Sequence, residues 1–108
     1  MKTKLLITIM LAISTFAVAG VTPEQIQVPE QIMEEICQRA ADRWPEEPSM
    51  QEYEIKLQIG AYKHLYAWKQ KHQGDATLQA IFKKAQKDWP GDYSMQWYQV
   101  EREVEALS

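Results

Sequence analysis

The chain contains a single cysteine, Cys37, among its 108 residues. A lone cysteine cannot close an internal disulfide, so the fold must rest on a hydrophobic core rather than on covalent cross-links. Two interpretations of Cys37 remain open. It is either a small buried hydrophobic side chain or a residue that forms an intermolecular disulfide between two copies.

An excess of positive charge is also missing. The sequence has 12 basic and 15 acidic residues, a formal net charge of −3, and its basic residues are scattered. Proteins that bind nucleic acid gather basic residues on one face, and simple adhesion to anionic lipid needs the same kind of cluster. The sequence therefore argues against both classes of partner.

Catalytic and metal-binding motifs are missing as well. There is no glycine-rich nucleophile turn and no phosphate-binding loop. His64 and His72 lie two helical turns apart, too far to share an ion without help. We therefore expect no metal, no cofactor and no enzymatic activity. The alternative is a hydrolase-like enzyme in which Glu47 and Asp92 act as a paired acid and base.

The longest apolar run, residues 5–18, falls short of the ~20 residues that a membrane-spanning helix needs. Lys2 and Lys4 precede it, and Ala17-Val18-Ala19 ends it with small residues at both outer positions. This pattern predicts a secretory signal peptide over residues 1–19, removed from a periplasmic or secreted protein. Residues 20–28 show no periodicity and are expected to form a flexible leader.

One segment occurs twice. Residues 36–56 and 81–101 align without a gap, 45 positions apart, and are identical at eight positions. Each copy contains Trp-Pro followed by Ser-Met-Gln. A period of this length is typical of helical repeats. The sequence therefore predicts a domain over residues 29–108 that consists of repeat 1 (29–74) and repeat 2 (75–108).

Helical periodicity places helices at about 29–43, 50–72, 76–88 and 95–107. The expected fold class is all-α, with four helices arranged as two tandem helix-loop-helix repeats in one small compact domain. Ser49, Ser94 and Asp75 are expected to cap helix N-termini, and Gly74 to end the second helix in a left-handed conformation. Gly60, inside that helix, indicates a close helix crossing.

Two apolar stripes run along the second helix, which indicates that it is contacted on two sides. The first stripe is Met50, Tyr53, Leu57, Ala61, Leu65 and Trp68, and the second is Ile55, Ile59, Tyr62 and Tyr66. The aromatic residues at matching positions of the two repeats are expected in the core. They are Trp44, Trp89, Tyr53 and Tyr98.

The remaining aromatic residues exceed what a small core requires. Because aromatic side chains are frequent at binding hot spots, we expect this surplus to form a binding surface. Its members are Tyr62, Tyr66, Trp68, Tyr93 and Trp97. A protein partner is favoured over a glycan, since no polar cluster of the carbohydrate-binding kind accompanies the aromatic residues.

The segment Trp89-Pro90-Gly91-Asp92-Tyr93-Ser94-Met95-Gln96 resembles a motif of small exported bacterial and phage-associated proteins of unknown function. The motif reads WPx(D/E)xSMQxY, and the first copy departs from it at Pro48, where an aromatic residue is expected. The resemblance covers about 30 residues, supports the helical-hairpin interpretation and implies no activity.

These features together predict an exported, non-enzymatic helical-repeat protein that binds another envelope or secreted protein as an adaptor or inhibitor. Insertion into a membrane after cleavage is not expected. A structural homo-oligomer, held by the second stripe of the long helix and by Cys37, is the alternative.

Overall fold

The computed structural model describes residues 20–108, so the predicted signal peptide lies outside the described residues. The elements are a 3₁₀ helix η1 (Pro23–Gln25) and the helices α2 (Glu30–Arg43), α3 (Pro48–Lys71), α4 (Ala76–Asp88) and α5 (Tyr93–Ala106). Residues 20–108 contain no strand, which confirms the all-α class. Among the described helices, none combines the length and apolar character that a bilayer crossing requires.

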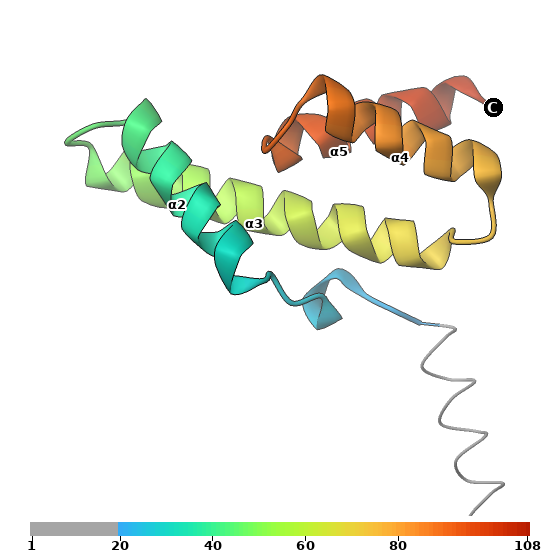
Figure 1. Cartoon of the computed structure of the whole chain (residues 1–108), viewed down its shortest axis with the longest axis horizontal. Helices are drawn as coiled ribbons and strands as arrows, with labels where there is room; N and C mark the ends of the chain where they lie inside the picture. Colours follow the sequence, from blue (N-terminus) through green and yellow to red (C-terminus); the bar gives the residue numbers. More distant parts are fainter. Residues whose placement is uncertain (1–19) are drawn as a thin grey trace, which may run out of the picture.

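The long helix α3 is the element on which the others assemble (Figure 1). Helix α2 folds back along the first part of α3, and α5 packs on α3 further along the chain. Helix α4 packs mainly on α5, so α4 and α5 form a second hairpin beside the first. Element η1 also contacts α3, and Ile26 behind it is buried, so the expected leader is in contact with the core.

The core receives one large, fully buried side chain from each of the four α-helices. These side chains are Ile36 of α2, Leu65 of α3, Phe82 of α4 and Val100 of α5. Burial of such side chains stabilises the fold by roughly 1.5–3 kcal/mol each. All four side chains belong to one hydrophobic cluster, so the two hairpins share a core.

The two Trp-Pro turns have closely similar backbones. Trp44 ends α2 at φ −126° and ψ 62°, and Trp89 ends α4 at φ −131° and ψ 64°. Glu46 has φ 63° and Gly91, at the matching position, has φ 75°. Proline disfavours the helical conformation in the residue before it, which explains why both helices end at tryptophan.

The helix caps differ from the expectation. Asp92, not Ser94, caps α5, since its Oδ1 accepts a hydrogen bond from the Met95 N–H at 3.1 Å. Helix α3 begins at Pro48, which places Ser49 inside the first turn. Both helices start two residues earlier than predicted. Proline is favoured at the first position of α3, and Asp92 caps α5. Asp75 caps α4 as expected.

The end of α3 and its glycine also differ from the expectation. Gly74 does not have a positive φ, and α3 ends at Lys71 with His72 as its C-cap. A Cβ added at Gly60 would meet nothing within 4 Å, so no close helix crossing lies there. Cys37 is exposed, which excludes its interpretation as a small buried side chain.

The expected first stripe of α3 is rotated out of the core at its N-terminal end. Tyr53 is 62% exposed and Leu57 is 43% exposed, whereas the polar residues Glu54 and Gln58 are buried. In the second hairpin, Tyr98 and Trp89 are exposed as well. The periodicity of α3 allows either face, and the polar contacts described below select the one that is buried.

Candidate functional site

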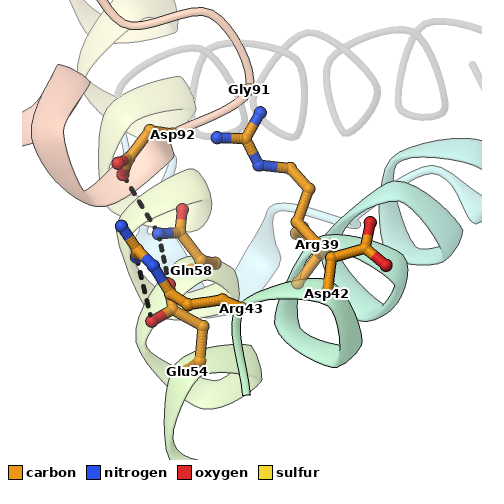
Figure 2. A pocket seen from close by; sticks show the side chains of 8 residues that line it. Arg39, Asp42, Arg43, Glu54, Gln58, Gly91 and Asp92 are labelled. Atoms are coloured by element: carbon orange, nitrogen blue, oxygen red, sulfur yellow. Dashed lines mark hydrogen bonds and ion pairs between the residues drawn. The ribbon is translucent and has the colours of Figure 1, made fainter. Parts of the chain in front are cut away.

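A cavity of about 350 Å³ lies where α2, α3 and the turn between α4 and α5 meet (Figure 2). Its lining is mostly polar and charged, which is unusual between packed helices. The lining residues are Ile36, Arg39, Asp42, Arg43, Glu54, Gln58, Gly91 and Asp92.

The side-chain amide of Gln58 is the centre of this cavity. Its Oε1 accepts hydrogen bonds from the backbone N–H groups of Tyr93 at 2.7 Å and Ser94 at 3.2 Å. Its Nε2 donates to Glu54 Oε2 at 3.0 Å and to Asp92 Oδ1 at 3.1 Å. The first N–H groups of a helix have no partner within that helix. Gln58 therefore caps α5 from a different helix, and this joins the two hairpins.

Two arginines of α2 border the cavity and are also engaged. Arg43 Nη1 lies 3.3 Å from Glu54 Oε1, and the exposed fractions of these side chains are 59% and 12%. Arg39 Nη1 donates to the Pro90 carbonyl at 3.1 Å. Figure 2 shows the Arg39 side chain extending toward Gly91. A Cβ at Gly91 would lie 2.5 Å from Arg39 Nη1, so glycine gives both the left-handed turn and the space that the arginine occupies.

The polar side chains that line the cavity contact other groups of the protein itself. Glu54 is held by Arg43 and Gln58, and Asp92 by Gln58 and the start of α5. Such a network is typical of a structural joint between hairpins. Glu47, the other carboxylate of the hydrolase alternative, is exposed and does not line the cavity that contains Asp92.

The described residues contain no group of three or more His, Cys, Asp or Glu side chains that could hold a metal ion.

The five predicted binding residues come together, but mainly inside the molecule. Tyr62 and Tyr93 are buried and make an edge-to-face contact with ring centroids 5.1 Å apart. Tyr66 stacks on Tyr62 at 4.3 Å. The rings of Trp68 and Trp97 are half-buried, 6.5 Å apart, and border a shallow hollow of about 320 Å³.

Burial of the tyrosines changes their acidity. Burial, with smaller effects of Tyr66 and Glu35, raises the pKa of Tyr93 to about 12. Burial is also the main reason why the pKa values of Tyr62 and Tyr66 lie above the ordinary tyrosine value. All three hydroxyl groups stay protonated at neutral pH, as expected for residues that stabilise the core.

The exposed apolar residues lie elsewhere, at positions that the sequence interpretation assigned to the core. A hollow of about 360 Å³ on the second hairpin contains Trp89, 39% exposed, and Tyr98, 52% exposed. Arg102 lines it too, with its guanidinium carbon 5.7 Å from the Tyr98 ring centroid and Nη1 donating to the Tyr98 hydroxyl at 2.9 Å. Hereafter this hollow is the Trp89–Tyr98 patch.

A signal for this patch is present in the sequence. Arg102 occupies the position that matches Leu57, and an arginine is rarely fully buried unless it is paired. The matching positions Tyr53 and Tyr98, one helical turn earlier, therefore share an exposed face in both hairpins.

Comparisons of the chain with protein-family models, with curated proteins and with solved structures returned no match.

Proposed function

We propose that the chain is an exported, non-enzymatic helical protein that binds another protein of the cell envelope through the Trp89–Tyr98 patch. The observation that carries this proposal is the exposure of Tyr98 and Trp89 beside Arg102. Tyrosine, tryptophan and arginine are the residues that most often dominate binding energy at protein interfaces.

The chemistry of the patch suggests the chemistry of its partner. The two rings and Met95 offer apolar area, and Arg102 adds a positive charge at the edge of Tyr98. A matching surface would insert an apolar side chain into the hollow and place a carboxylate next to the guanidinium. Export is supported by the sequence of residues 1–19.

The proposal includes the arrangement of the chain as two tandem repeats. We infer that the two hairpins are copies of one unit, which is supported by the eight identities and by the matching torsion angles of Glu46 and Gly91. Tyr53 would then be the counterpart of Tyr98, and the first hairpin would offer a second contact surface.

The test is capture of envelope proteins by the purified protein, followed by a binding measurement with the protein that is captured. A Trp89→Ala, Tyr98→Ala variant is compared with a Gln73→Ala control, at an exposed position of the turn after α3, each with its fold checked by circular dichroism. We expect the partner's affinity to fall at least about tenfold for the first variant, because hot-spot truncations cost 2 kcal/mol or more. Equal affinity for wild type and the first variant would exclude the patch as the binding site.

The alternative of a homo-oligomer through the second stripe of α3 has less support. Ile55, Ile59 and Tyr66 of that stripe pack against the core within the chain, and Tyr62 is part of the core. The exposed thiol of Cys37 keeps a disulfide-linked dimer as a candidate. Electrophoresis of the exported protein without reductant distinguishes this dimer from the monomer.

A further inference from the structure

An open groove of about 580 Å³ runs between α4 and α5 on the second hairpin. Its lining is largely apolar at the centre, with an ion pair between Lys84 and Glu103, 3.3 Å apart, at one side. The residues that matter here are Ala80, Ile81, Lys84, Glu103, Ala106 and Leu107.

The first hairpin holds the second Trp-Pro turn in the cavity around Gln58. The groove lies at the equivalent place on the second hairpin. A shift of 45 residues converts Ile36, Arg39 and Gln58 of the cavity into Ile81, Lys84 and Glu103 of the groove. The same shift relates two buried residues to two exposed ones. Ala61 and Tyr62 are 8% and 7% exposed, whereas Ala106 is exposed and Leu107 is 59% exposed.

The first Trp-Pro turn is exposed, whereas the second is docked against the first hairpin. Residues 45–49 are all exposed, whereas Gly91, Asp92 and Ser94 are partly covered and Tyr93 is buried against the first hairpin. Residues 20–108 therefore contain one docked turn, one exposed turn, and one open groove of the kind that receives such a turn.

We propose that this groove receives the first Trp-Pro turn of a second copy of the chain, so that copies associate head to tail. Such an interface is heterologous, because the two contacting surfaces differ, and it extends into chains or closes into rings.

Charge complementarity supports this occupant. Gly91 lies so close to Arg39 that a Cβ there would be 2.5 Å from Nη1. The matching residues are Glu46, whose φ is close to that of Gly91, and Lys84. A side chain at position 46 would therefore point at the groove lysine and form an ion pair across the interface.

The apolar contact between the turn and the groove also has a counterpart in the proposed interface. Within the chain, Tyr93 packs on Tyr62, and in the proposed interface Pro48 would pack on Leu107. Two features make the association weak. Helix α5 has 14 residues where α3 has 24, so less surface is available. The hydrogen bonds of Gln58 also have no counterpart, because Glu103 would face the like charge of Glu47 and Pro48 has no N–H to donate.

The first experiment is sedimentation of the purified protein under reducing conditions, from micromolar to millimolar concentration. We expect the average mass to rise without stopping at the dimer and to fall again at high salt, which screens the ion pair. Reductant removes any contribution of the exposed Cys37.

The second experiment separates this interface from any other by charge reversal. Glu46→Lys and Lys84→Glu should each lower the association constant about tenfold, as expected when like charges are brought together. An equal mixture of the two variants should recover it, because each turn then meets a groove of opposite charge. Lys83→Glu, which changes the neighbouring residue outside the groove, is the matched control and should associate like wild type.

The third experiment makes the interface resemble the internal one. Pro48→Tyr with Glu103→Gln introduces the counterparts of Tyr93 and Gln58, and it should raise the association constant at least about tenfold. A folded double variant that is monomeric at millimolar concentration would overturn the proposal. So would single charge variants that associate like wild type, or a mixture that fails to associate.

Discussion

Gln58 shows how one polar side chain can decide the position of two helices. It is 6% exposed, yet its amide oxygen and nitrogen each make two hydrogen bonds. Two of these bonds satisfy N–H groups at the start of α5, which would otherwise be covered without a partner. A buried polar group is tolerated only when it is satisfied in this way.

We therefore expect Gln58→Ala to destabilise the protein by about 1–3 kcal/mol, the cost of leaving buried donors without an acceptor. The free energy of unfolding from urea denaturation measures this effect. Gln73→Ala, at an exposed position of the turn after α3, is the control and should change it little. A loss at Gln58 as small as that of the control would mean that water replaces the amide.

Tyr93 makes the stability of the protein depend on pH in the alkaline range. The pKa is raised from the model-compound value of 10.0 to about 12 in the folded protein, mainly by burial. A raised folded pKa means that the folded state binds the proton more tightly than the unfolded state. The resulting stability is fully present below about pH 10 and is lost as the pH rises toward about 12.

We expect the free energy of unfolding to fall over this pH range, and to fall less steeply in Tyr93→Phe. Denaturation curves at a series of pH values measure both slopes. Tyr62 and Tyr66 contribute in the same direction, so part of the slope should persist in the variant. Identical slopes in the two proteins would show that Tyr93 ionises as freely when folded as when unfolded.

Among the elements, α3 has a glycine in its interior, and no close contact there requires the absence of a side chain. Gly60 lies within the 24-residue helix, and a Cβ there would meet nothing within 4 Å. Glycine in a helix costs about 1 kcal/mol relative to alanine, because the unfolded chain loses more freedom on folding.

Gly60→Ala should therefore stabilise the protein by roughly 0.5–1 kcal/mol. Thermal unfolding followed by circular dichroism gives the shift in midpoint. Gly91→Ala is the informative counterpart and should destabilise, since Gly91 has φ 75° and faces Arg39. A loss of stability at Gly60 would reveal a contact on this face, such as a partner or a second copy.

At the scale of the whole molecule, the two hairpins share one core. Leu65 is fully buried on α3, and α3 contacts α2 on one side and α5 on another. Neither hairpin covers its apolar face alone, so the two are expected to unfold together.

Leu65→Ala should cost about 2–5 kcal/mol and leave unfolding cooperative. Circular dichroism reports the loss of helix, and tryptophan fluorescence reports both hairpins, since Trp44 lies in the first and Trp89 in the second. The two curves should coincide. Separate transitions would indicate that the hairpins are independent units joined only by the polar cavity.

The four helices and their approximate ends could be predicted from the sequence. These features are local: proline ends the preceding helix, Asp75 caps the next one, and apolar periodicity marks each segment. Local rules apply over a few residues, and that is why the helices match the expectation to within two residues.

The buried face of α3 and the place of the candidate site depend on how the helices pack. Gln58 is buried because it meets N–H groups 35 and 36 residues further along the chain. No pattern within α3 contains that information, and its two apolar stripes predicted contact on both sides. Tyr53 and Tyr98 are consequently exposed, whereas Tyr62 and Tyr93 form the core. A helix with apolar residues on two sides is oriented by its partners, since burial is a property of the assembled fold rather than of the segment.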